Sequence, residues 1–225
     1  MENKTQKNAF LEYEADAWFE RNKKAIESYS TDRDRVVSLL KFYKIKANNI
    51  LEIGCSAGYR LNGIADVFGE EVNVFGIDPS SIAIEFGKKK YPRVDFTKGT
   101  ADNLSEYDSG SMDVVIVGFV FYIIDREIFF KTVSEIDRIM KNGGVLIIVD
   151  FFSEAALKNV YEHIKDFKAY TFKQNYDEIF TASKLYYLLD KSTWSHSTKE
   201  LDATDNYFDK YSISLLKKDI HASYK

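Results

Sequence analysis

The spacing of apolar positions along the chain alternates between helical and strand-like periods, and it predicts an alternation of the two elements. Residues 8–29 and 32–43 carry apolar side chains at helical intervals among charged ones, so we expect two N-terminal helices there. Continuous apolar runs then predict five strands, at 48–53, 72–77, 94–97, 112–117 and 145–150. The segments between these strands predict helices at 59–68, 80–90 and 125–140.

This alternation indicates an α/β fold with a mostly parallel sheet and helices on both faces, because each strand is apolar along its whole length. In such a fold the ligand binds beyond the carboxyl ends of the strands. A further helix is predicted at 155–167. After it, aromatic strand-like runs are expected to complete the sheet with an antiparallel pair, at 168–172, 184–189 and 207–216.

The composition narrows the possible partners. Hydrophobic residues make up 45% and charged residues 29% of the 225 positions, which is typical of a globular protein with a sizeable core. The net charge of −4 offers no general attraction for nucleic acid, so no nucleic-acid partner is expected. The longest apolar run, near 114–124, is too short for a membrane-spanning helix, so we expect no membrane partner.

Cysteine and histidine usage adds two expectations. The single Cys55 and an N-terminus without the apolar segment of a secretory signal predict a cytoplasmic protein. His163 and His221 have no companion ligands at metal-binding spacing, so no metal site is expected.

Two loops, after the first and second predicted strands, carry the candidate chemistry. Gly54 and Gly58 are separated by three small residues, which lets a ligand approach the backbone and the N–H groups of the next helix. Asp78 ends the second strand, where a carboxylate can accept both hydroxyls of an unphosphorylated ribose. The alternative role for Asp78 is to cap the following helix, although Ser80 can also serve as that cap.

The first loop matches neither of the common diphosphate-binding loops. A nicotinamide site favours Gly-x-Gly-x-x-Gly, and Ser56 stands where the second Gly would admit the pyrophosphate. A P-loop needs Lys after its last Gly, whereas Tyr59 follows Gly58. The two loops therefore indicate a nucleoside ligand without a diphosphate.

Five short motifs follow one another over residues 50–150. They are Glu52-x-Gly54-x-x-x-Gly58, Gly76-Ile77-Asp78-Pro79-Ser80, Gly99-Thr100-Ala101-Asp102-Asn103-Leu104, Met112-Asp113-Val114-Val115 and Asn142-Gly143-Gly144. Together they resemble the successive motifs of class I S-adenosylmethionine-dependent methyltransferases. The resemblance implies a Rossmann-like fold with a seven-stranded sheet, and S-adenosylmethionine as the cofactor. Residues 14–23 and 118–130 resemble a bacterial subgroup associated with surface-glycan or secondary-metabolite genes.

The resemblance also implies a role for each motif position. The amino-acid and ribose parts of the cofactor would face the first loop, at Gly54, Cys55, Ser56 and Gly58. The other implied contacts are Asp78 and Pro79 at the ribose, Thr100 and Ala101 at the adenine, and Gly118 and Phe119 at the methyl-donor end. Thr100 replaces the Asp more usual in the family, so the adenine amino group is expected to contact Asp102 or the backbone.

Residues outside the motifs supply further candidates. Trp18 and Arg21 share a face of the first predicted helix, and Arg21 is a candidate partner for the cofactor's carboxylate. A hydroxyl acceptor needs a base, for which Asp125 and His196 rank first and Asp150 behind them. Their alternative roles are a helix N-cap for Asp125, a polar strand terminus for Asp150 and a loop histidine for His196.

We therefore expect one domain over 1–225, with an N-terminal helical lid at 1–45, a cofactor-binding core at 46–152, and C-terminal strands with acceptor-pocket elements at 153–225. The predicted activity is methyl transfer from S-adenosylmethionine to a small molecule, with a sugar or surface-glycan precursor as the candidate acceptor. The alternatives are a non-catalytic S-adenosylmethionine-binding protein, a nicotinamide-dependent oxidoreductase, which Ser56 disfavours, and an aminopropyl transferase, for which no paired acidic site is found. The sequence leaves the oligomeric state open.

Overall fold

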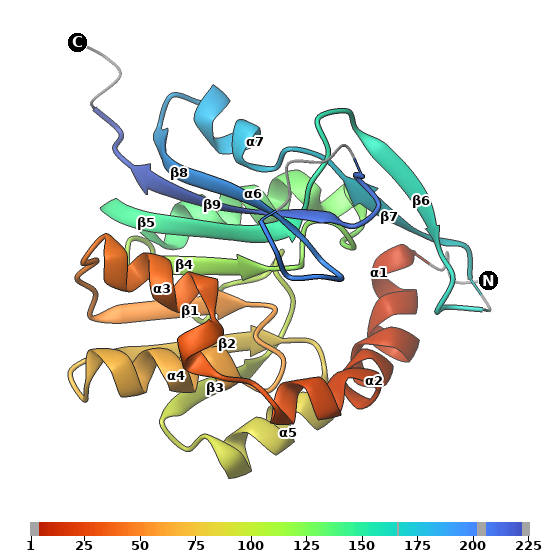
Figure 1. Ribbon diagram of the computed structural model, residues 1–225, viewed down its shortest axis with the longest axis horizontal. Coiled ribbons are helices and arrows are strands. Elements are labelled where there is room, and N and C mark those ends of the chain that lie inside the picture. Colours follow the sequence, from red (N-terminus) through yellow and green to blue (C-terminus); the bar gives the residue numbers. More distant parts are fainter. Residues whose placement is uncertain (1–4, 166, 202–205, 222–225) are drawn as a thin grey trace.

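The structure, a computed structural model, describes residues 5–165, 167–201 and 206–221. A seven-stranded sheet has the order β3-β2-β1-β4-β5-β9-β8, and β6 and β7 form a separate two-stranded sheet (Figure 1). The first five strands of the large sheet are parallel: β3 (Val94–Lys98), β2 (Asn73–Asp78), β1 (Asn49–Ile53), β4 (Met112–Gly118) and β5 (Met140–Phe151). The antiparallel strands β9 (Lys210–Lys218) and β8 (Tyr186–Ser195) complete it, which confirms the predicted fold class.

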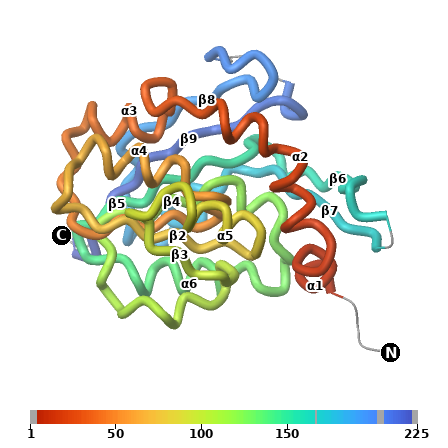
Figure 2. The backbone as a smooth tube through the Cα atoms, turned by 90° about the horizontal axis from the view of Figure 1, so that it is seen from below, coloured from red at the N-terminus to blue at the C-terminus, as the bar shows by residue number. Residues whose placement is uncertain are grey.

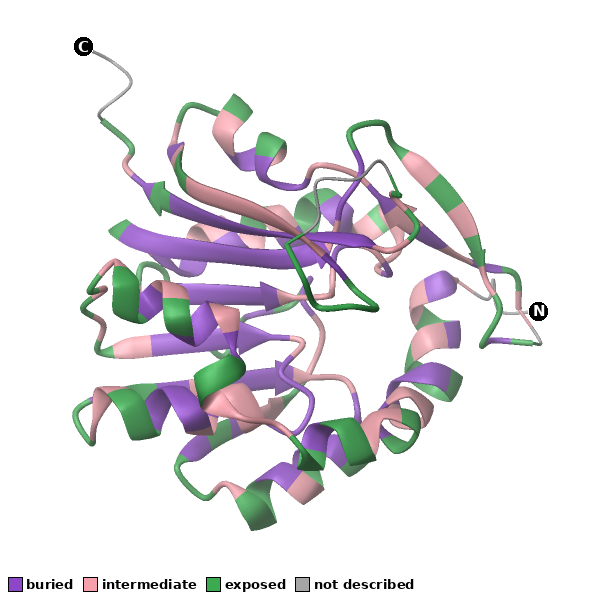
Figure 3. Cartoon of the chain, in the orientation of Figure 1, coloured by how far each residue is buried: buried purple, intermediate pink, exposed green. Residues whose placement is uncertain are grey.

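Helices cover both faces of the large sheet. On one face lie α3 (Arg35–Phe42), α4 (Tyr59–Phe68) and α5 (Ser81–Lys90), and on the other α6 (Phe129–Ile139) and α7 (Asp177–Ala182) (Figure 2). Successive strand residues point to opposite faces, so Val114 and Ile116 of β4 join the first apolar layer and Val115 and Val117 the second. Burial on both sides explains why the central strands are apolar at consecutive positions (Figure 3).

The strand order reverses between β1 and β4, and this reversal creates a crevice. From β1 the chain proceeds outward through β2 to β3, and it then returns to place β4 on the opposite side of β1. The loops that leave β1 and β4 therefore diverge at the carboxyl edge of the sheet, where ligands bind in open α/β folds.

The N-terminal segment lies across this edge (Figure 1). Its continuous helix consists of α1 (Gln6–Ala9), the π-helical η1 (Phe10–Glu14) and α2 (Ala15–Glu27). The buried Gln6 side chain donates to the carbonyls of Ile123 (2.8 Å) and Tyr170 (2.9 Å), and it accepts from the Tyr170 N–H (2.9 Å). Farther along, Asp16 accepts from the Ser80 hydroxyl at 2.6 Å. We call this segment, residues 6–27, the lid.

The predicted helix at 155–167 is wrong. Strand β6 (Leu157–Tyr161) pairs antiparallel with β7 (Ala169–Lys173), and together they form a hairpin outside the large sheet. The apolar residues of this segment fit either period by spacing alone. Packing decides the outcome, because Tyr161 and Ile164 contact Ala9 of the lid in a small apolar cluster.

Other predicted elements match the structure with small shifts at their ends. Helix 125–140 begins with a 3-10 turn, η3 (Arg126–Ile128), and strand β5 includes the Asn-Gly-Gly segment that was expected to precede it. The short helix α7 was not predicted. The antiparallel pair that completes the sheet is β8 with β9, whereas the run at 168–172 became β7 of the hairpin.

Candidate cofactor and acceptor site

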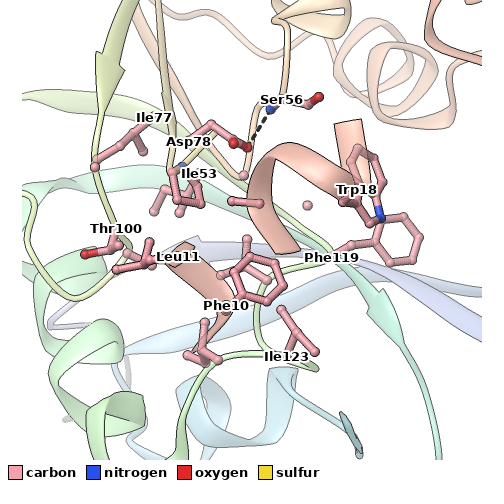
Figure 4. Close-up of a pocket in the computed structure, with 18 of the residues that line it drawn as sticks. Phe10, Leu11, Trp18, Ile53, Ser56, Ile77, Asp78, Thr100, Phe119 and Ile123 are labelled. Carbon is pink, nitrogen blue, oxygen red and sulfur yellow. Dashed lines mark hydrogen bonds between the residues drawn. The ribbon is translucent and has the colours of Figure 1, made fainter. Parts of the chain in front are cut away.

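A cavity lies between the lid and the carboxyl ends of β1, β2 and β4, and it holds about 1160 Å³ of space, open solvent included. From the lid, its lining residues are Lys7, Phe10, Leu11, Ala15 and Trp18. Figure 4 shows Asp78, Ser56 and Thr100 on one side of this space and Phe10, Phe119 and Ile123 on another.

Gly54 permits the close approach of the loops that follow β1 and β4. Its φ is +77°, and a Cβ there would lie 2.5 Å from Val120 Cγ2 and 2.9 Å from the Gly118 carbonyl oxygen. Gly58 has φ +75°, and a Cβ there would meet the Phe96 ring at 2.5 Å. Gly54 lines the cavity, whereas Gly58 and the buried Cys55 lie behind the lining residues. The two glycines are therefore required by packing as well as by access to the backbone.

Asp78 joins the first two loops. One carboxylate oxygen accepts from the Ser56 N–H at 2.8 Å, and the other accepts from the Ser80 N–H at 2.9 Å. Ser80, not Asp78, caps α5, since its hydroxyl accepts from the Ala83 N–H at 3.1 Å. Burial raises the pKa of Asp78 to about 6, against the opposing effect of these backbone hydrogen bonds. Asp78 and Pro79 line the cavity, where the remaining lone pairs of the carboxylate are available to a ligand's hydroxyls.

A buried charge cluster lies beside the first loop. The Arg60 guanidinium donates to Asp34 at 2.9 Å and also to Glu52 Oε1. The second oxygen of Glu52, Oε2, is buried and has no hydrogen-bond partner among the residues that the structure describes. Burial raises the pKa of Glu52 to about 7. With two carboxyl groups and one guanidinium, the cluster is suited to bind a further cation.

Sequence reasoning missed Arg60 as a site residue, although a signal for it exists. Arg60 lies in the first turn of α4, where the helix dipole disfavours a positive charge. Such a position calls for acidic partners nearby, and Glu52 and Asp34 supply them.

The adenine side of the predicted site contains an ion pair. Thr100 and Ala101 line the cavity as expected. Asp102, which was expected near the adenine amino group, is buried behind them and accepts from Lys7 Nζ at 2.7 and 2.8 Å. Lys7 itself lines the cavity, so the lid contributes a charged side chain that the sequence analysis did not identify.

Arg21 and Trp18, the predicted lid residues, differ in their positions. Trp18 lines the cavity. Arg21 is not among the lining residues; it donates through both terminal nitrogens to the buried Glu14, and its side chain is 38% exposed. The predicted pairing of Arg21 with a cofactor carboxylate is thus replaced by an ion pair within the lid helix. The spacing of Leu11, Ala15 and Trp18 could have identified the inner face of the lid.

Phe119 forms a wall at the methyl-donor end of the predicted site. Its φ of +54° is unusual for a bulky residue, and its N–H donates to the Val149 carbonyl at 2.7 Å. The ring packs against Phe151 and Tyr122, with ring centres 5.4 and 6.5 Å away. Gly118, Phe119 and Tyr122 all line the cavity. A strained backbone at a residue that lines a cavity, as at Phe119, is typical of a functional site.

The three candidate bases lie in different surroundings. Asp125 lines the cavity; it caps η3 through the Glu127 N–H at 3.1 Å and also accepts from the Lys7 N–H at 3.4 Å. Asp150 is buried and accepts from the N–H groups of Phe151 (2.8 Å) and Tyr122 (3.3 Å), and burial raises its pKa to about 7. It lies outside the lining.

His196 is exposed and also lies outside the lining. Its ring packs against the rings of Phe151 and Phe119, with centres 5.2 and 6.1 Å away. Partial burial of the ring lowers the pKa of His196. In the described part of the chain, the cavity is lined only by residues between Lys7 and Ile128. The acceptor-pocket role expected for 153–225 stays a prediction.

The described residues contain neither a candidate membrane-spanning helix nor a candidate metal-binding cluster. No helix there is long and apolar enough to cross a membrane. No group of three or more His, Cys, Asp or Glu side chains in these segments is arranged to hold a metal ion.

Comparison with known proteins identifies the class. A family model described as a methyltransferase domain matches residues 50–144. Two Campylobacter jejuni proteins named ubiquinone/menaquinone biosynthesis C-methyltransferase UbiE are each 30% identical to the chain. The serotype O:2 protein aligns over 80% of this chain and 79% of its own length. The serotype O:6 protein aligns over 52% of this chain and about half, 49%, of its own length.

A solved structure supports the same fold. The Burkholderia thailandensis 1,6-didemethyltoxoflavin-N1-methyltransferase, determined with 1,6-didemethyltoxoflavin and S-adenosylhomocysteine bound, has a TM-score of 0.68 at 11% identity. The match covers 90% of this chain and 84% of that one. The chain belongs to the class I S-adenosylmethionine-dependent methyltransferases, and S-adenosylmethionine is accordingly its cofactor.

We expect Gly54→Ala to lower the free energy of unfolding by about 1–3 kcal/mol more than Gly110→Ala, as measured by urea denaturation. Both glycines have a positive φ, +77° and +64°, so both substitutions introduce similar backbone strain. Only at Gly54 would the new methyl group also meet Val120 and Gly118, because nothing lies within 4 Å of a Cβ at Gly110. Equal losses for the two variants would contradict the proposed steric role of Gly54.

Proposed function

We propose that this methyltransferase acts on a small, mostly apolar acceptor that binds between the lid and Phe119. The observation that carries the proposal is the change of character along one continuous cavity. The Asp78 carboxylate lies on one side of the cavity, and the side chains of Phe10, Phe119 and Ile123 lie on another (Figure 4). Glu52, Leu11 and Ile124 also line the cavity.

The polar end fits the cofactor. The unpartnered Oε2 of Glu52 is suited to the ammonium group of S-adenosylmethionine, and Asp78 to its ribose hydroxyls. The backbone of Gly54 and Ser56 would contact the amino-acid part, and Thr100 with Ala101 the adenine. When bound, the cofactor supplies a methyl group on a positively charged sulfur. Arg21 is assigned no contact with it, because Glu14 already occupies that guanidinium.

The chain's own contribution to catalysis is positioning. Methyl transfer is an in-line displacement, so the acceptor atom must be held opposite the leaving sulfur. The rings of Trp18 and Phe119 line the space where this alignment has to occur, and aromatic faces attract a cation such as the sulfonium. The lid above them would exclude water from the reacting atoms.

The apolar wall favours a flat ring compound over a sugar. A sugar presents many hydroxyl groups, each of which needs a partner when it is buried. Apolar and aromatic side chains predominate in the lining beside Phe10, Leu11 and Ile123, and Lys7, Tyr122 and Asp125 are the polar residues nearest to them in the chain. The relatives agree with this preference: one pair is named for ubiquinone and menaquinone biosynthesis, and the Burkholderia enzyme was solved with 1,6-didemethyltoxoflavin. A sugar or surface-glycan precursor is the competing acceptor class.

A two-part experiment tests this function. Isothermal titration calorimetry with S-adenosylhomocysteine should show binding, and a panel of quinols, aromatic heterocycles and nucleotide sugars should then be screened for release of S-adenosylhomocysteine from S-adenosylmethionine. We expect turnover with a member of the apolar ring classes. Turnover only with nucleotide sugars would contradict the acceptor class. Binding without turnover on any panel member would favour a non-catalytic binding protein.

We expect cofactor affinity to rise with pH between about 5 and 7, because an ionised carboxylate accepts hydroxyl hydrogen bonds better than a protonated one. The pKa of Asp78 is about 6, and ribose binding to the ionised form lowers it, so binding strengthens as pH rises through that value. Asp78→Asn should weaken S-adenosylhomocysteine binding about tenfold or more at pH 8 and remove the step near pH 6.

Calorimetric titrations from pH 5 to 8 measure both effects. Glu52, with its pKa of about 7, is intact in both proteins, so the difference between the two profiles isolates Asp78. Identical profiles for the wild type and Asp78→Asn would remove Asp78 from the ribose site.

Asp125 is our candidate base for an acceptor that loses a proton, since it is the candidate whose side chain lines the cavity. Asp125→Asn keeps the shape of the side chain and should lower kcat about 100-fold, with the dissociation constant for S-adenosylhomocysteine changed less than twofold. His196→Ala serves as the comparison, and we expect it to retain turnover within about threefold. Unchanged kcat in Asp125→Asn, or the larger loss in His196→Ala, would refute this assignment.

A further inference from the structure

The lid contains a buried carboxylate outside the cofactor and acceptor contacts. Glu14 is only 1% exposed, and it lies among the lid residues without lining the cavity. Its oxygens accept from the two terminal nitrogens of Arg21 and from the Tyr161 hydroxyl. A buried carboxylate is costly unless donors satisfy it, so the three donors around Glu14 indicate a built arrangement in the lid.

The partners of Glu14 belong to two different elements. Arg21 is seven residues away on the same continuous helix, so this ion pair does not connect the lid to anything else. Tyr161 belongs to β6 of the hairpin. The hydrogen bond from Tyr161 to Glu14 is therefore one of the contacts that hold the lid to the hairpin, and Arg21 supplies the charge that stabilises the buried carboxylate.

Other lid residues contact either the hairpin or the cavity. Gln6 bonds to both backbone groups of Tyr170 in β7, and Ala9 packs on Ile164 and Ala169. One side of the lid thus contacts the hairpin, while Leu11, Ala15 and Trp18 line the cavity. Any displacement of the lid from the hairpin would also displace this cavity wall.

The hairpin is in turn connected to the acceptor end of the cavity. The Phe172 N–H of β7 donates to the Tyr122 carbonyl at 2.7 Å. The Tyr122 ring lines the cavity, and burial, together with the charges of Asp150 and Glu14, raises the pKa of its hydroxyl. Glu14 therefore lies close to the wall that would hold the acceptor, although it does not form that wall.

We propose that Glu14 is a positioning residue for methyl transfer: its bond to Tyr161 holds the lid against the β6–β7 hairpin and so retains the cofactor and its product under the lid. The inference rests on the proposed function of this cavity. Release of S-adenosylhomocysteine requires the lid to move, and the hydrogen bond between Tyr161 and Glu14 is one of the contacts that must break.

The test uses the release of S-adenosylhomocysteine, for which no acceptor is needed. The chain has two Trp residues, so Trp194→Phe leaves Trp18, which lines the cavity, as the sole tryptophan, and excitation near the red edge of its absorption reports on it selectively. In this background, Tyr161→Phe removes the hydroxyl but keeps the ring. We expect the dissociation rate of S-adenosylhomocysteine, measured by stopped-flow fluorescence, to rise about tenfold, and acrylamide quenching of Trp18 in the complex to increase.

Tyr43→Phe is the matched control. The Tyr43 hydroxyl donates to Asp190 at 2.8 Å, so the control also removes one hydrogen bond between a tyrosine and a carboxylate, but at a place outside the cavity. It should leave both the release rate and the quenching of Trp18 unchanged within twofold. Glu14→Gln keeps an acceptor for Tyr161 and should show a smaller acceleration than Glu14→Ala.

The outcomes separate this inference from the proposed function. Failure of the Trp194→Phe protein and the wild type to bind S-adenosylhomocysteine would overturn the proposed function. Normal binding, with release from Tyr161→Phe and Glu14→Ala no faster than from Tyr43→Phe, would overturn the positioning role alone, whatever the melting temperatures. If Tyr161→Phe does not fold, the comparison of Glu14→Ala with Glu14→Gln decides: equal release rates would overturn the positioning role.

Discussion

The contact between the loop after β1 and the loop after β4 is the constraint on which the site depends. Parallel pairing places the ends of these strands side by side, and Gly54, with no side chain, lets the second loop approach it. The Gly54 N–H meanwhile donates to the Ile77 carbonyl at 2.9 Å, which binds the same loop to the end of β2. Three strand ends are thereby held together, and the cofactor contacts proposed for Gly54, Ser56 and Asp78 are made from them.

The elements of the cofactor-binding core follow from local sequence signals. Strands buried on both faces must be apolar at consecutive positions, so their locations could be predicted from hydrophobic runs alone. The capping of α5 by Ser80 and the left-handed glycine at position 58 are likewise local effects of single residues. For the same reason Gly54, Ser56 and Asp78 could be placed at the site from their positions after the strands.

The lid and the β6–β7 hairpin depend on contacts between distant segments of the chain. The spacing of apolar residues in the sequence does not encode these contacts. Residues 155–167 have an apolar spacing that fits a helix, but pairing with β7 and packing against Ala9 produce a strand. Arg21 has the position expected of a ligand-binding residue, yet Glu14 in the π-helical segment lies within its reach. Residue propensities do not predict this π-helical segment. Its wider turn changes which side chains of the lid point in the same direction.

The buried carboxylates of the cavity link the stability of the fold to ligand binding. Burial raises the pKa of Glu52 from 4.5 to about 7 and that of Asp78 from 3.8 to about 6. A carboxyl group whose pKa is higher in the folded state stabilises the fold at low pH, and this contribution is lost as pH rises from the unfolded value through the folded one. Near neutral pH the cavity therefore holds carboxylates that the protein only partly compensates. An ammonium group beside Glu52 and two hydroxyl donors at Asp78 would offset this charge, so the buried carboxylates that reduce the stability of the fold near neutral pH are the ones that favour a cationic nucleoside.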